Sequence, residues 1–301
     1  MSVQVRSFTS SLAPVLASTT DQPSLYWLGQ AGFALKFQDS LALIDPYLSD
    51  ALAKKYKGTE FPHVRMMATP VSVEALPKVR FVFITHRHGD HFDVETVLKL
   101  AETWPDCRFL LPAAEEEFAL AAGLKPSSIV LTDALQTHEL GTFRVTAIPA
   151  AHENPDRDDD GRYPYLGYVI QCGDATVYHS GDSVPFADLS QAISGLSIDV
   201  ALLPVNGRDA FRASKKVPGN FTLEEAIELC EKHGIQSMIA HHFGMFEFNT
   251  ISRGEIDAAA AKSLHCEVIP ANLGAQYTVL ATPKNDAKSN ELASSKVGQN
   301  V

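Results

Sequence analysis

The stretch FVFITHRHGDH, residues 81–91, decides the fold. Its first five residues are aromatic, aliphatic or β-branched, which predicts a buried strand. The next six place three imidazoles and one carboxylate in one loop, and Gly89 allows that loop to turn tightly. A hydrophobic core cannot satisfy so many polar groups, so we expect the loop to bind a metal ion, for which imidazole and carboxylate are good ligands.

The composition argues against several classes of partner. The chain has 301 residues, of which 36 are acidic and 25 basic, with a net charge of -11. So acidic a chain is not expected to bind nucleic acid or an anionic membrane, and an anionic small-molecule substrate would have to meet local cations. No stretch approaches the roughly 20 apolar residues of a membrane span. We therefore expect a cytoplasmic protein without membrane contact.

Apolar runs of strand length alternate with helix-length amphipathic segments, which is typical of an α/β protein. The expected strands cover residues 24–28, 32–37, 41–44, 80–85, 200–203 and 237–240, with hairpins at 136–149 and 166–179. The expected helices cover residues 93–102 and 113–122 and a segment that Thr222 caps. No linker of biased composition divides the chain. We expect a flexible arm over residues 1–22, one domain over 23–282 and a polar, disordered tail over 283–301.

The loop itself resembles a known family. Thr85-His86-Arg87-His88-Gly89-Asp90-His91 is similar to the T-H-x-H-x-D-H motif of the metallo-β-lactamase superfamily. This resemblance implies a four-layer αβ/βα sandwich, in which two mixed β-sheets pack face to face with helices outside. It also implies two divalent metal ions. Mixed imidazole and carboxylate ligands suit zinc, manganese or iron, and the resemblance suggests manganese or zinc. Such a pair lowers the pKa of a bound water and polarises a carbonyl or phosphoryl oxygen, so the expected chemistry is hydrolysis.

The resemblance implies further ligands after later strands, and the chain has a candidate at each place. His152 follows the strand that ends near Pro149, and Asp182 lies in a Gly-Asp pair. The last ligand is His241 or His242; His242 is favoured because residues 240–243 align with the superfamily's Pro-Met-His-Tyr, although this chain lacks the proline and the tyrosine. The implied set is His86, His88 and His152 for one metal and Asp90, His91 and His242 for the other, with Asp182 shared. Asp90 and Asp182 are the expected catalytic carboxylates.

Several other stretches resemble one branch of the superfamily, the branch that includes L-ascorbate-6-phosphate lactonase. They are residues 26–33, 44–49, 178–183, 203–209 and 245–250, so the likeness runs from about residue 25 to residue 250. It implies a lactonase that assembles into a homo-oligomer.

Three residues are expected to contact an anionic substrate. Asn206 and Arg208 follow a strand, at the edge where α/β proteins place ligands, and a guanidinium there could hold a phosphate or carboxylate by two hydrogen bonds. The alternative is that Asn206 belongs to a turn and Arg208 pairs with Asp209. Arg65 is the third candidate, also as an anion-binding guanidinium.

Two segments are expected to support the site. Asp45 is expected to orient a histidine ligand, or else to be a turn residue before Pro46. The acidic run 156–160 is either a solvated loop or a lid that shapes the pocket.

The leading functional hypothesis is hydrolysis of a sugar-acid lactone, free or phosphorylated. A phosphodiesterase using the same metals is the nearest rival, and iron-dependent oxygen chemistry on this fold is another. The alternative outside enzymes is a metal-stabilised binding module. The complete set of seven ligand candidates argues against that alternative, because a site without chemistry need not keep both metal positions.

Overall fold

The buried strands assemble into two sheets. The computed structural model describes residues 2–281, so the expected tail at 283–301 lies outside the described residues. One sheet has the strand order β1 (Val3–Ser7), β15 (Ala275–Val279), β2 (Thr20–Gly29), β3 (Gly32–Gln38), β4 (Ser40–Ile44), β5 (Phe81–Phe83), β6 (Arg108–Pro112) and β7 (Ile129–Thr132). The other has the order β14 (Glu267–Pro270), β13 (Ser237–His241), β12 (Val200–Pro204), β11 (Ala175–His179), β10 (Leu166–Cys172), β9 (Phe143–Pro149) and β8 (Thr137–Leu140).

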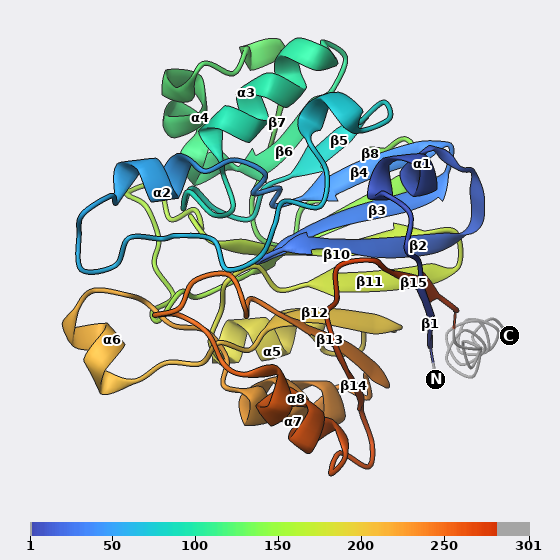
Figure 1. Ribbon diagram of the computed structural model, residues 1–301, viewed down its shortest axis with the longest axis vertical. Helices are drawn as coiled ribbons and strands as arrows, with labels where there is room; N and C mark the ends of the chain where they lie inside the picture. Colours follow the sequence, from blue (N-terminus) through green and yellow to red (C-terminus); the bar gives the residue numbers. More distant parts are fainter. Residues whose placement is uncertain (1, 282–301) are drawn as a thin grey trace, which may run out of the picture.

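Both sheets are mixed. Strands β2 to β4 are antiparallel and β4 to β7 parallel, while β8 to β11 are antiparallel and β11 to β14 parallel. Figure 1 shows helices on the outer side of each sheet: α1 (Leu12–Ala17), α3 (Val94–Thr103) and α4 (Glu116–Ala122) on one, and α5 (Ala187–Ile193), α7 (Leu223–Lys232) and α8 (Arg253–Ala260) on the other. The expected four-layer αβ/βα sandwich is therefore confirmed.

The core explains why the sheets are stacked. Along β2, Leu25 and Trp27 belong to the large cluster between the sheets, whereas Tyr26 and Leu28 belong to a second cluster with the helices outside. Successive side chains of a strand point to opposite faces, so a strand that is apolar at every position is buried on both. The continuous apolar run read in the sequence is thus the signature of a middle layer.

Local signals of the sequence are realised as caps and hairpins. Thr222 and Glu225 form a reciprocal capping box at the start of α7, which satisfies two backbone N–H groups. Gly123 ends α4 with a φ of 111°, a conformation that glycine adopts without strain. The two expected hairpins correspond to β8–β9 and β10–β11.

The first 22 residues do not form the loose arm that was expected. β1 pairs with β15, α1 buries Leu12 and Leu16, and β2 already begins at Thr20. Four of the five side chains of β1 are exposed, so this strand carries almost no hydrophobic pattern to read. Among residues 2–281, no helix is long and apolar enough to cross a membrane.

Candidate metal centre

Four separate segments bring polar side chains to one edge of the sandwich. The loop 86–91 follows β5, and His152 lies three residues beyond β9. Asp182 follows β11, and His242 comes directly after β13. This edge lies beside α2 (Ala51–Lys55) and α6 (Ala210–Ser214), which lie on the same side of the molecule (Figure 1).

The seven expected ligands converge there. Three sets have donor atoms within 4.8 Å of one another: His86, His88 and His152; His86, His91 and Asp182; and Asp90, His91 and His242. The two oxygens of Asp182 lie 3.3 Å from His91 Nε2, 3.3 Å from His242 Nε2 and 3.6 Å from His152 Nε2. Asp182 therefore stands between the two expected halves of the site, in the position expected for a shared carboxylate.

The donor set fits cations. His86 Nε2, His91 Nε2 and Asp182 Oδ1 are buried and have no hydrogen-bond partner among the described residues. A buried polar atom without a partner is costly, and a divalent cation would satisfy all three atoms at once. The mixed nitrogen and oxygen set without thiolate suits zinc, manganese or iron.

Burial and charge set the protonation of these groups. Burial lowers the pKa of His152 to about 4 and is the main reason why the pKa of His86 lies well below its ordinary value. Burial would raise the pKa of Asp182, but His242 and His91 beside it hold that pKa well below its usual range. Burial would lower the pKa of His91, but Asp182, Asp45 and Asp90 around it raise that pKa well above its ordinary value. Neutral imidazole and ionised carboxylate are the forms that bind metal, so His91 has to release a proton when a cation binds.

A set of buried hydrogen bonds holds the cluster in place. Asp45 accepts from the backbone N–H of Thr85 at 2.8 Å, and its other oxygen lies 2.7 Å from His91 Nδ1. This contact turns the Nε2 atom of His91 toward Asp182. Gln30, which the sequence did not single out, donates to Asp90 at 2.8 Å, and its backbone oxygen accepts from the N–H of His242.

The structure separates His241 from His242. His242 has a φ of 61°, which turns its ring toward Asp182 and Asp90. His241 instead stacks on His179 at 5.0 Å, beside Phe33 between the sheets. The geometry therefore agrees with the choice of His242.

Gly181 permits the sharp turn that presents Asp182. Its φ is 62°, and a Cβ atom there would lie 2.5 Å from the backbone oxygen of Leu166. Any other residue would have to push β10 away, so the Gly-Asp pair is a steric requirement of this turn.

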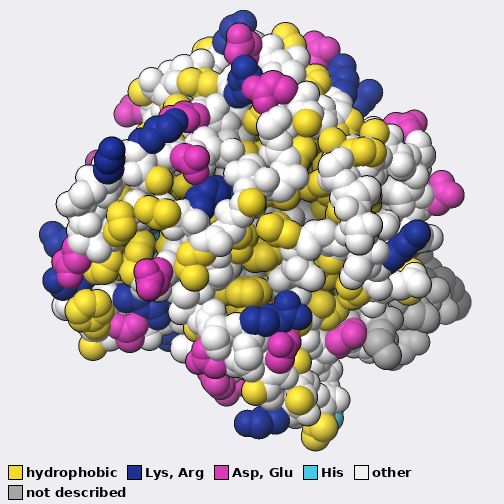
Figure 2. Space-filling view, viewed as in Figure 1, with side chains coloured by type: hydrophobic (Ala, Val, Ile, Leu, Met, Phe, Trp, Pro, Cys, Tyr) yellow, Lys and Arg dark blue, Asp and Glu magenta, His cyan; other side chains and the backbone are white. Residues whose placement is uncertain are grey.

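A cleft of about 680 Å³ opens above the cluster. His88, Asp90, His152, Asp182 and His242 form its base. The wall comes from α2 and the loop after it, from the segment after α6 and from residues 246–249. The ion pair between Glu60 and Lys215 connects the first two of these at 2.8 Å. In Figure 2, hydrophobic side chains and Lys or Arg side chains are interleaved on the side of the molecule where these segments lie.

The comparisons with known proteins agree with this architecture. A family model described as the beta-lactamase superfamily domain matches residues 42–243, a range that holds all seven ligand candidates. The chain belongs to this superfamily. One relative of this superfamily member is a UPF0173 metal-dependent hydrolase from Desulforamulus reducens, 28% identical over 230 residues, which are 73% of this chain and 83% of the relative.

Two solved structures share the superfamily fold. An isothiocyanate hydrolase from Delia radicum gut bacteria superposes with a TM-score of 0.68 at 19% identity, over 86% of this chain and all of that one (100%). Igni18, a metallo hydrolase from the archaeon Ignicoccus hospitalis, has a TM-score of 0.64 at 18% identity, over 87% of this chain and 100% of its own. At these identities the likeness establishes the fold alone.

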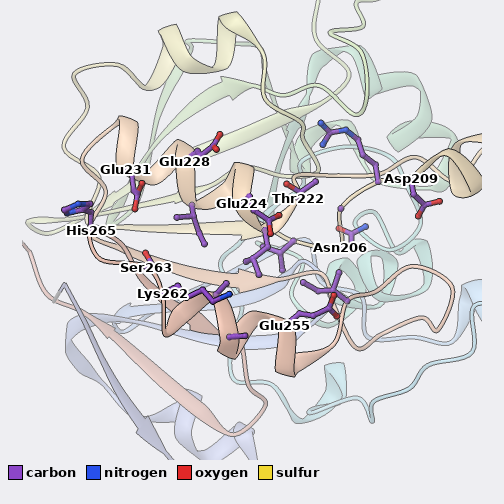
Figure 3. Close-up of a pocket in the computed structure, with 18 of the residues that line it drawn as sticks. Asn206, Asp209, Thr222, Glu224, Glu228, Glu231, Glu255, Lys262, Ser263 and His265 are labelled. Atoms are coloured by element: carbon purple, nitrogen blue, oxygen red, sulfur yellow. The ribbon is translucent and has the colours of Figure 1, made fainter.

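Asn206 and Arg208 do not line the cleft of this superfamily member. Asn206 donates to Asn249, behind the cleft wall, and Arg208 makes a two-pronged ion pair with Glu225 at 2.6 Å. Both residues line a second cavity, between α7 and α8, whose other labelled side chains include several glutamates (Figure 3). The expectation that Arg208 holds an anionic substrate is corrected, and so is its alternative pairing, because Asp209 pairs with Arg212.

Arg65 and the acidic run also lie outside the cleft lining. Arg65 donates to the backbone oxygens of Tyr47 and Ser49 and lies 4.6 Å over the Tyr47 ring. Through Nη1 it fastens one loop to another, while its Nε and Nη2 are buried without a hydrogen-bond partner among the described residues. Among the described residues that line the cleft, none comes from 156–160, where Arg162 pairs with Asp158 and Asp160. In the structure this run is a mostly exposed loop that its own ion pairs hold.

Proposed function

We propose that this protein is a metal-dependent hydrolase that uses two divalent ions to open a carboxylic ester or lactone. The observation that carries the proposal is the position of Asp182, whose two oxygens face three histidines from three different segments. A relative named as a metal-dependent hydrolase and membership of the superfamily support the same reaction class.

The ligand roles follow the spatial groups. His86, His88 and His152 would hold one ion and Asp90, His91 and His242 the other, with Asp182 between them. Of the metals that suit this donor set, we propose manganese or zinc. When bound, the ions would supply a water of lowered pKa and a Lewis acid for the scissile carbonyl.

The chain's own residues orient and insulate this centre. Asp45 keeps the proton of His91 on Nδ1, so Nε2 presents its lone pair to the cluster. Gln30 restrains Asp90 by its amide. The cluster is buried at the base of an open cleft, so a substrate would approach from one side only.

We propose that the substrate is a carboxylic ester or lactone and not a phosphodiester. The stretches 203–209 and 245–250, which resemble the lactonase branch, lie beside the site: Asn206 bonds to Asn249, and Asn249 lines the cleft. We further propose that the substrate is a small anion, that the protein works in the cytoplasm and that it assembles into a homo-oligomer.

Metal removal and return test this function. Protein stripped with a chelator should lose turnover of a panel of esters and lactones, and manganese or zinc should restore it. His88→Ala should lower the bound metal, measured by mass spectrometry, while the circular dichroism spectrum stays native. His265→Ala is the matched control, because this exposed histidine lies outside the cluster. Full turnover by metal-free protein, or by His88→Ala, would contradict the proposal.

A further inference from the structure

The wall of the metal cleft has a charge unlike that of the whole chain. Its lining includes four cations, Lys55, Arg87, Lys215 and Lys216, in a protein of net charge -11. Away from the two carboxylates of the metal cluster, Glu60 is the single acidic residue of the described lining. This part of the cleft therefore attracts anions, and bound divalent ions would strengthen the attraction.

Two of these cations are available for a ligand. Glu60 already neutralises Lys215, and Arg87 lies 3.7 Å from Glu115. Lys55 and Lys216 form no ion pair with any described residue; the Lys55 ammonium lies 5.0 Å over the Tyr56 ring. Lys216 has a φ of 58°, so its backbone adopts a conformation that is unfavourable for a lysine.

The same wall is aromatic. Tyr56 stacks on His63 at 4.2 Å, and His63 meets the edge of Phe248 at 4.7 Å. Phe61 lies 4.8 Å from Phe248, and Phe246 continues the row at 5.9 Å. Such a continuous set of rings favours a planar or apolar ligand body.

The wall offers little to the hydroxyl groups of a sugar. Away from the metal cluster, the uncharged polar side chains of the described lining are Tyr56, Thr59, His63 and Asn249. The Thr59 hydroxyl donates to the backbone of Tyr56, and the Asn249 oxygen accepts from Asn206 and Arg212. His63 Nδ1 is likewise engaged, by the backbone oxygen of Phe61. Sugar hydroxyls would therefore gain few partners for the water they lose, which is costly.

We propose that the cleft recognises an aromatic ester or lactone that carries a carboxylate or phosphate, with Lys55 and Lys216 holding the anionic group. This rests on the proposed hydrolysis and replaces the sugar-acid lactone expected from the sequence. In the reaction, water adds across the acyl carbon–oxygen bond: its hydroxyl goes to the acyl carbon and its proton to the leaving oxygen.

Matched lactones test the substrate class on the metal-loaded full chain. The probes are dihydrocoumarin with a carboxylate on its ring, its methyl ester, its phosphonate analogue and gluconolactone 6-phosphate. We expect the KM of the carboxylate or the phosphonate to be about tenfold below that of the methyl ester and of the sugar lactone. The carboxylate and phosphonate arms show which anion is preferred. A lower KM for gluconolactone 6-phosphate overturns the inference.

Single variants test the residues. Lys55→Met and Lys216→Met should each raise the KM of the anionic lactone about tenfold, with a much smaller fall in kcat and little change for the methyl ester. Lys57→Met is the matched control, because Lys57 is exposed on the same segment and does not line the cleft. Phe248→Ala should raise the KM of both forms. An equal effect of the lysine variants on both forms, or none, overturns the assignment.

Binding of the ring-opened product separates this inference from the reaction itself. The chemically prepared product is titrated by calorimetry into wild type and the lysine variants. If the loaded protein opens no lactone but binds the product about tenfold more weakly in Lys55→Met and Lys216→Met, the proposed hydrolysis fails and the anion site stands. If turnover is present and product affinity does not respond to either lysine, the hydrolysis stands and the anion site fails.

Discussion

The metal cluster and the cleft wall above it are built in opposite ways. The cluster stands at the ends of buried strands, and hydrogen bonds from Asp45 and Gln30 restrain it. The wall comes from α2 and the loop after it, from the segment after α6 and from residues 246–249, and its lysines are exposed. Catalytic groups need a fixed geometry, whereas a recognition surface on loops can change without disturbing it. The four predictions below test this division between the two regions.

The largest effect is expected from Asp182→Asn. The amide keeps the size of the side chain but removes the charge that faces His91 and His242. We expect turnover to fall by a factor on the order of 1000 or more, together with loss of bound metal. Metal content and kcat are measured on the same preparation. Unchanged metal content would show that Asp182 is not the shared ligand.

Asp45→Asn should have an intermediate effect. The carboxamide cannot hold the proton of His91 as strongly, so metal affinity should fall by roughly 10- to 100-fold. Excess metal should restore much of the turnover, which distinguishes an orienting residue from a ligand. The measurement is a metal titration of the stripped protein. Unchanged metal affinity would mean that the hydrogen bond between His91 and Asp45 is not needed to hold the ligands in place.

Glu115 is buried and lies 3.7 Å from Arg87, a residue of the cleft lining, so it tests how a buried carboxyl group beside the wall affects stability. Burial raises the pKa of Glu115 to about 7 from an ordinary value of 4.5, although Arg87 opposes the rise. The folded chain therefore binds this proton more tightly than the unfolded chain, and the free energy of unfolding should fall as the pH rises from 4.5 to 7. Glu115→Gln stays neutral and should reduce that fall by roughly 1 to 2 kcal/mol, measured by urea unfolding at pH 5 and pH 8. Parallel pH profiles of the two proteins would refute this role.

The smallest effect is expected from Lys215→Ala in the wall. Its ion pair with Glu60 is largely exposed, with exposed side-chain fractions of 38% and 57%. Exposed pairs contribute about 0 to 1 kcal/mol, so the melting temperature should move by no more than a few degrees. A large loss of stability would mean that the wall is as tightly built as the cluster.

The sequence singled out residues that the structure brings together, because each of them is signalled locally. The histidine loop follows a recognisable buried strand, and the Gly181-Asp182 pair marks a turn that excludes other residues. The choice between His241 and His242 needed the backbone, because only the φ of 61° shows which ring turns toward Asp182. The pairing of β1 with β15 was not predictable, because β1 is short and most of its side chains are exposed.

The cleft wall could not be predicted, for a different reason. Lys55 ends α2 and Lys216 follows α6, so they lie far apart in the chain and line one cleft only because these two segments fold over the same edge. Arg208 was assigned to substrate binding because its ion-pair partner Glu225 lies 17 residues away in the sequence. Glu225 also belongs to the capping box of α7, and no sequence pattern shows that the same carboxylate binds Arg208. The positions of residues at strand ends follow from the fold, whereas the positions of residues on loops depend on long-range contacts that the sequence does not reveal.

The pairing of β1 with β15 has a practical consequence for handling the protein. β1 protects the outer hydrogen-bonding groups of β15, and its own side chains include Arg6 and Gln4, which discourage further pairing. A truncation that starts at Phe8 would leave β15 as an open template for other chains. Such a shortened protein should keep its metal centre but aggregate through the unpaired edge of β15.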